Sequence, residues 1–156
     1  MSMSIPAFHV SDQSKVDGTG EVFISTRKDA ASAGVFGLRV SAHFIPGSDP
    51  YPVGSLTIKV DLSDSAKGLF TATSIELINS YGKHNPTLFM TGRCNGDGVG
   101  MPKGLRYWLM VVDNQTGGDG QGAVDVVGFA IHDNLGNRVA YGTGPLKSGA
   151  FSVGPK

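Results

Sequence analysis

The chain has 156 residues, a length typical of one domain that buries its core without disulfides or metal ions. Its 13 basic and 13 acidic residues give a formal net charge of zero, which argues against nucleic acid or an anionic membrane as a partner. The single Cys94 excludes a disulfide within the chain. No apolar run reaches the about 20 residues that cross a bilayer, so the sequence predicts no transmembrane segment.

Alternating apolar residues indicate strands from residue 36 onward. Every second residue is apolar in 36–44 and in 56–62, which is typical of half-buried strands. A strand-like run then extends from Leu69 to Ile78. Residues 105–112 are apolar at both alternating sets of positions, which predicts a central strand covered on each side.

The following segments predict the rest of the sheet. Residues 125–132 alternate again, and we expect Val126–Ile131 to pair with Leu105–Val112. Two further strand-like segments, 138–141 and 149–153, are separated by a Gly- and Pro-containing breaker. The total is eight or nine short strands, with helix limited to single turns.

This pattern predicts an all-β fold, an antiparallel β-sandwich of the jelly-roll type. The single sandwich domain is expected to span residues 20–156. Residues 1–19 are polar and poorly patterned, and we expect them to form an amino-terminal arm that is disordered or packed along the sheet edge.

Three segments resemble a known family: Thr91–Gly96 with its TG-x-x-NG turn, the aromatic strand from Tyr107 to Asp113, and the segment from Asp125 to Asp133. Over residues 55–153 the chain resembles the post-COAP-1 type domain of large secreted bacterial proteins, although Asp97–Gly104 departs from its pattern. The resemblance implies an extracellular, non-enzymatic β-domain and leaves its ligand open. Because the first residues lack the regions of a signal peptide, the localisation stays uncertain.

The sequence gives little support for catalysis. No G-x-S-x-G motif is present, and the four histidines are far apart and lack close metal-ligand spacing. The two glutamates, Glu21 and Glu76, are not brought together by any pattern in the sequence, which argues against a glycosidase pair. We therefore expect a protein that is not an enzyme and requires no cofactor.

Loops rich in Asn, Asp and Gly provide the candidate metal site. Such residues occur in tight turns, and turn chemistry alone can explain residues 134–137 as a hairpin connection. Calcium is the alternative use, because it prefers carboxylate, amide and carbonyl oxygens. The calcium ligands that we expect are Asp113, Asn114, Asp119 and Asp125, which surround one loop.

Aromatic and arginine side chains provide a second candidate site, for carbohydrate. We expect Trp108 to be a core residue packed across Gly128, and not an exposed platform. Tyr51 and Tyr81, which lie next to proline or glycine, are better placed for exposure, and Arg106 lies near polar loops. These three residues are the predicted ligand-binding set.

The function predicted from the sequence is a non-enzymatic binding module of extracellular type. Its ligand is expected to be a carbohydrate or another surface component, with calcium as a possible aid, held by the loops at the strand ends. The alternative is a structural or self-assembling β-protein, or a leaderless secreted effector or toxin component, for which a homo-oligomer is the expected form.

Overall fold

The structure, a computed structural model, describes residues 14–24, 33–43, 52–63, 66–81, 86–97, 102–114 and 124–154. No helix in this part of the chain is long and apolar enough to cross a membrane. All the regular elements are strands, as the sequence predicts: β1 (Lys15–Ile24), β2 (Gly34–His43), β3 (Val53–Leu62), β4 (Gly68–Ala72), β5 (Leu77–Tyr81), β6 (Thr87–Asp97), β7 (Leu105–Val112), β8 (Val126–His132) and β9 (Arg138–Gly154).

The strands form a closed antiparallel barrel, so the predicted sandwich or jelly roll is wrong. Their order is β4-β3-β2-β1-β9-β8-β7-β6-β5, and an additional pairing of β4 with β6 joins the two ends of an eight-strand ring. β5 is an extra strand that pairs with the other half of β6. A sandwich would leave edges at β4 and β6, whereas this barrel joins them by hydrogen bonds.

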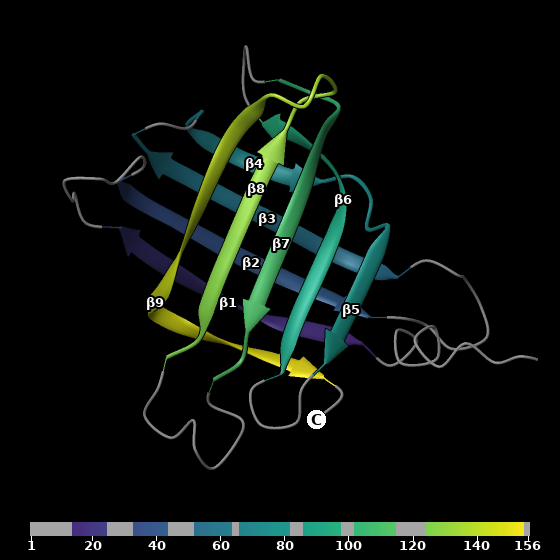
Figure 1. The fold of residues 1–156 in the computed structure, drawn as a ribbon, viewed down its shortest axis with the longest axis vertical. Coiled ribbons are helices and arrows are strands. Elements are labelled where there is room, and N and C mark those ends of the chain that lie inside the picture. The colour runs from purple at the N-terminus through teal and green to yellow at the C-terminus, as the bar shows by residue number, and fades with distance from the viewer. Residues whose placement is uncertain are drawn as a thin grey trace, which may run out of the picture.

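β9 belongs to both sides of the barrel. Its residues up to Pro145 pair with β8, and those from Leu146 onward pair with β1. The strand bends early in the second part, where the register with β1 shifts between Leu146 and Ser148 and Gly149 has a φ of 90°. Figure 1 shows the result as two crossing layers: a front layer of β5 to β8 with the first part of β9, and a rear layer of β1 to β4 with its last part.

The first half of β1 overlaps the segment, residues 1–19, that the sequence predicts to be an arm. β1 begins at Lys15 and pairs along its length with β2, while its other edge pairs with β9. Ser14, just before it, accepts hydrogen bonds from the amide and hydroxyl of Ser80 on β5. Residues 1–13 lie outside the described part of the chain.

A short segment between β4 and β5 is attached to β6. The amides of Thr73 and Glu76 donate to the carbonyls of Arg93 and Thr91, both at 2.8 Å. Gly92 lies directly beneath this crossing, where a Cβ atom would come within 2.1 Å of the Ser74 carbonyl oxygen. The predicted run from Leu69 to Ile78 is therefore two strands separated by a crossing segment.

Inward-facing side chains from all nine strands fill the barrel. Alternate residues of β3, for example, are buried at Leu56, Ile58, Val60 and Leu62. Cys94 is buried among these apolar groups, and burial raises the pKa of its thiol to about 11. Because an eight-strand barrel is just wide enough for side chains to fill it, a ligand of the described residues would bind on the outer surface.

Candidate binding face

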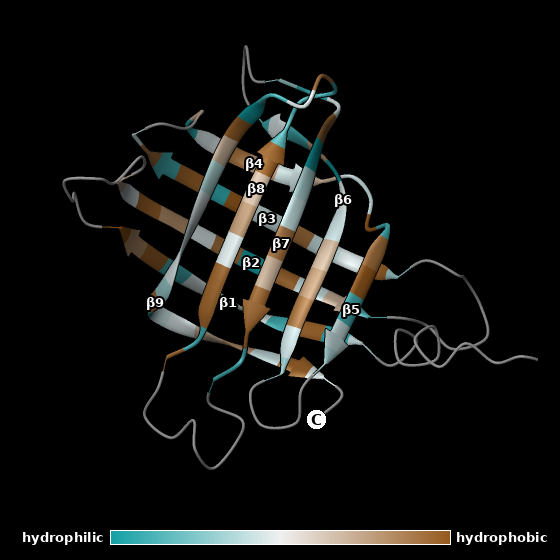
Figure 2. Ribbon diagram, in the orientation of Figure 1, coloured by the Kyte–Doolittle hydropathy of each residue, from teal (hydrophilic) through white to brown (hydrophobic). Residues whose placement is uncertain are grey.

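Trp108 lies on the outer surface of the barrel, so the prediction that it is a core residue is wrong. Its side chain is 42% exposed, whereas the neighbouring Tyr107 is buried. Gly128 faces the side chain of Thr143 and not an aromatic ring. The predicted pairing of β7 with β8 is confirmed, but β7 is not covered on both sides: Arg106 and Trp108 are exposed, and Met110 and Val112 are half-buried. Figure 2 shows hydrophobic residues along much of β7 and β8.

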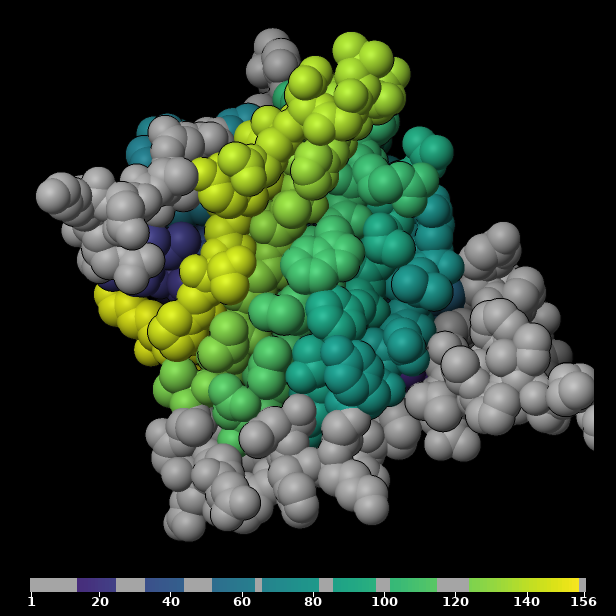
Figure 3. Space-filling model, in the orientation of Figure 1, coloured from purple at the N-terminus to yellow at the C-terminus, as the bar shows by residue number. Residues whose placement is uncertain are grey.

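Three aromatic rings from successive strands form what we call the aromatic stripe: Tyr81 of β5, Phe89 of β6 and Trp108 of β7. The centroids of Tyr81 and Phe89 are 5.9 Å apart, and those of Phe89 and Trp108 are 5.5 Å apart. Tyr81 is 56% exposed and Phe89 is half-buried. Figure 3 looks onto this outer face of the front layer, where the side chains of β6 and β7 gather.

A charged cluster adjoins the stripe on the same face. Arg106 precedes Trp108 by two residues on β7, and Arg93 is directly opposite Arg106 on β6. Glu76 accepts a hydrogen bond from Nη1 of Arg106 at 2.8 Å and forms an ion pair with Nε of Arg93 at 3.5 Å. One carboxylate therefore holds both guanidinium groups.

This hydrogen bond from Arg106 is the main reason that the pKa of Glu76 lies below its ordinary value. Burial opposes this bond as the second-largest effect, and the positive charges of Arg106 and Arg93 and a hydrogen bond from Ser74 lower the pKa further. The side chain of Glu76 is 34% exposed, so solvent screens these pairs. They orient the arginines more than they stabilise the fold.

Beyond the arginines, the outer face has a hollow next to the turn between β8 and β9; Figure 1 shows this turn at the top of the front layer. This arginine hollow has a volume of about 360 Å³ and is lined by Arg93, Gly104, Arg106, His132, Asp133, Asn134 and Gly136. Asp133 accepts the amides of Leu135 and Asn137 at 2.9 and 2.8 Å. These bonds, chiefly the one from Asn137, keep the pKa of Asp133 below its usual value, and the expected hairpin connection at 134–137 is present.

The predicted calcium ligands lie at the opposite end of the front layer. Asp113 and Asp125 are buried, and their carboxylates accept the amides of Val153 and Phe151 on β9 at 3.2 and 2.8 Å. Asn114 donates its amide to the other oxygen of Asp125 at 2.9 Å. Asp119 lies outside the described residues, so the calcium site stays a prediction. Melting curves recorded with calcium and with a chelator would test it.

Within the described part of the chain, no group of three or more His, Cys, Asp or Glu side chains is placed to hold a metal ion. The geometry instead gives Asp113 and Asp125 a structural role. Each carboxylate ties the bent second half of β9 to an end of β7 or β8.

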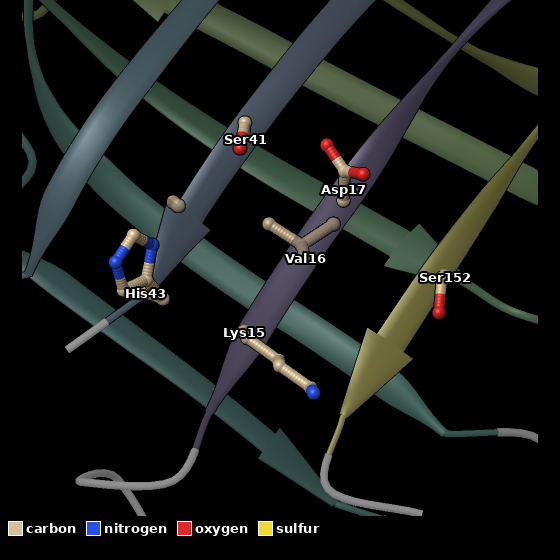
Figure 4. A pocket seen from close by; sticks show the side chains of 7 residues that line it. Lys15, Val16, Asp17, Ser41, His43 and Ser152 are labelled. Carbon is tan, nitrogen blue, oxygen red and sulfur yellow. The ribbon is translucent and has the colours of Figure 1, made fainter.

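A second hollow, of about 290 Å³, lies on the outer face of the rear layer. Figure 4 shows it between β1, β2 and the end of β9, lined by Lys15, Asp17, Ser41, His43, Ser152 and two buried neighbours. Among the described residues, no hydrogen bond joins His43 to Ser41 or Ser152. The serine, histidine and aspartate of this hollow are therefore not arranged as a catalytic triad in the structure.

Of the predicted carbohydrate set, Tyr81 and Arg106 lie on one face, at opposite ends of a path that passes through Phe89 and Trp108. Tyr51 lies outside the described residues. The sequence reasoning missed Phe89, Arg93 and Glu76. One signal could have identified the outer face of β7: Arg106 and Trp108 are two positions apart in a strand, so their side chains point to the same side.

Comparison of the chain with family models, with curated proteins and with solved structures finds no match. The resemblance to the post-COAP-1 type domain therefore stays a prediction.

Proposed function

We propose that the protein is a non-enzymatic binding module that holds a carbohydrate against the outer face of β5, β6 and β7. The observation that carries the proposal is the aromatic stripe, two of whose rings are about half exposed. The ligand would lie on the sheet surface, and not in the strand-end loops that the sequence analysis favours.

The chemistry of this face supports a sugar ligand. Pyranose rings have apolar faces that pack on aromatic rings, and hydroxyls at their edges that need donors and acceptors. The stripe provides the first kind of contact, and Arg106 and Glu76 provide the second. Two residues of an extended strand span about 7 Å, so Arg106 lies close enough to Trp108 for one ligand to touch both.

Affinity electrophoresis in gels that contain hydroxyethyl cellulose, xylan, galactomannan, dextran or laminarin tests the proposal. We expect at least one polysaccharide to retard the protein, and Trp108→Ala and Tyr81→Ala to abolish most of that retardation. Phe23→Ala is the matched control, because Phe23 is 53% exposed but lies on β1.

Each result has a clear consequence. Retardation that Trp108→Ala removes and Phe23→Ala leaves intact supports the proposal. Absence of retardation across the panel, or equal loss in Phe23→Ala, contradicts it. The self-assembling alternative then takes its place, and light scattering would show a species larger than the monomer of 16.2 kDa.

A further inference from the structure

The arginine hollow provides charged and hydrogen-bonding groups that the aromatic stripe lacks. We infer that it is the polar subsite of the binding face and that it selects an uncharged glycan with neighbouring free hydroxyls over an acidic glycan. This inference rests on the proposed function, since it names the class of sugar that the same face would take.

The first step is the charge of the hollow. Arg93 and Arg106 are both neutralised in part by Glu76, which binds one nitrogen of each. Asp133 adds a carboxylate to the lining. With His132 counted as neutral, the lining itself has two positive side chains and one negative side chain. Glu76 is outside this lining but pairs with both arginines, and with it the formal charge of the whole group is zero.

The second step is competition for the arginines. Both guanidiniums share the carboxylate of Glu76, and the lowered pKa of Glu76 keeps that carboxylate ionised. A carboxylate on the ligand would have to displace Glu76 or lie beside it, with Asp133 also nearby. Like charges at short range repel, so an acidic sugar is disfavoured here.

The third step is the arrangement of donors and acceptors. An arginine has five N–H donors and no acceptor, an ionised carboxylate only accepts, and a sugar hydroxyl does both. Within the described residues, no other protein group bonds to the guanidinium of Arg93 or Arg106. The alternating Arg93, Glu76 and Arg106 therefore offer acceptors and free donors side by side, which matches a pair of neighbouring hydroxyls.

The fourth step is continuity with the stripe. Thr91 on β6 is directly opposite Trp108, and Arg93 is directly opposite Arg106, so the hollow begins one outward position beyond the indole. The hairpin at Asp133–Asn137 closes the far side of the hollow. A glycan that lies along the stripe would place one sugar unit in the hollow.

The test compares each polysaccharide that retards the protein with its carboxymethylated derivative, which has the same backbone and added charge. We expect the neutral form to bind at least about ten-fold more tightly, and raised salt to leave its binding unchanged. Glu76→Gln removes one negative charge and should narrow the preference by raising the affinity for the carboxymethylated form. Arg93→Gln should widen the preference for the neutral form by lowering the affinity for the carboxymethylated form. Circular dichroism is the control that both variants are folded.

The outcomes separate the two proposals. If the carboxymethylated form binds as tightly as the neutral form or more tightly, in a manner that depends on Trp108, the inference about the hollow is overturned and the binding face stands. If Glu76→Gln and Arg93→Gln leave the preference unchanged, the hollow is not the selective element. If no polysaccharide binds through Trp108, the proposed function itself fails, and the inference fails with it.

Discussion

Phe89 on β6 and Trp108 on β7 are diagonal neighbours, with ring centroids 5.5 Å apart and an interplanar angle of 37°. Tyr81 is related to Phe89 by the same diagonal step across β5 and β6. Aromatic side chains can reach diagonal partners on adjacent antiparallel strands. A continuous stripe thus arises from three residues that are distant in the sequence.

The fluorescence of Trp108 should report its exposure directly, because it is the only tryptophan of the chain. Iodide should quench the folded protein readily, since the side chain is 42% exposed. A bound glycan should reduce this quenching by covering the indole. Quenching as weak as that of a core tryptophan would contradict the outward orientation of the side chain.

Two adjacent substitutions on β7 should differ sharply in their effect on stability. Leu109→Ala should lower the free energy of unfolding by about 2–5 kcal/mol, because Leu109 is fully buried in the barrel. Trp108→Ala should cost less than about 1.5 kcal/mol, the range of one aromatic contact. Urea unfolding measures both, and equal losses would place Trp108 in the core.

Asp125→Asn should destabilise the barrel by about 1–3 kcal/mol in the same measurement, because the buried carboxylate accepts amides from both Phe151 and Asn114. An Asn side chain would keep one acceptor and turn a donor toward the other amide. Asp61→Asn is the control, since the side chain of Asp61 is 76% exposed and should contribute almost nothing. An Asp125→Asn protein as stable as the control would remove the structural role of this carboxylate.

The thiol of Cys94 should be inert in the folded protein at neutral pH. It is buried, and its pKa of about 11 leaves almost no reactive thiolate. An aromatic disulfide reagent should therefore modify Cys94 only after denaturant is added. Rapid reaction of the native protein would show that the barrel opens at β6.

The Glu76 cluster should make stability depend on pH in the acidic range. Its folded pKa lies below the ordinary 4.5, so the stabilising contribution is complete above that value and is lost as the pH falls through the folded pKa. Glu76→Gln should remove this part of the pH dependence while leaving the neutral-pH stability little changed, since the pairs are solvent-screened. If the stability of the wild type and of Glu76→Gln falls equally as the pH is lowered, the result would argue against these ion pairs.

The local pattern of the chain predicted much of the fold. Alternation identified the strands at 36–44 and 56–62, and a continuous apolar run identified the strand at 105–112. The pairing of Val126–Ile131 with Leu105–Val112 is confirmed. These features depend on neighbouring residues or on consecutive strands, whose geometry is set locally. The turn at 134–137 was predictable for the same reason.

Closure of the barrel was not predictable in this way. It depends on β4 pairing with β6 and on β9 passing from β8 to β1 through a bend. A strand has the same alternation of buried and exposed residues in a sandwich and in a barrel, so periodicity cannot distinguish them. The breaker at Gly142–Pro145 also predicted two strands where the structure has one.

The candidate binding face was only partly predictable because, apart from Arg106, both sets of positions on β7 are apolar. A mid-strand position and the space left by Gly128 favoured Trp108 as the core residue. The buried ring is instead Tyr107, whose hydroxyl donates to the Ser74 carbonyl at 3.0 Å. That hydrogen bond joins β7 to the crossing segment, a contact across many residues that local patterns do not encode. Tyr81 and Arg106 were found from their exposure and chemistry, but Phe89 and Glu76 needed the register of the sheet.

The most direct test of the account is a titration of the wild-type protein and Trp108→Ala with the neutral polysaccharide that gives the strongest retardation. Calorimetry measures the affinity of each protein. The account predicts saturable binding to the wild type and an affinity at least about ten-fold lower in the variant. Phe23→Ala should bind like the wild type. Equal affinity of all three proteins, or no binding to any neutral polysaccharide, would contradict a carbohydrate site on the aromatic stripe.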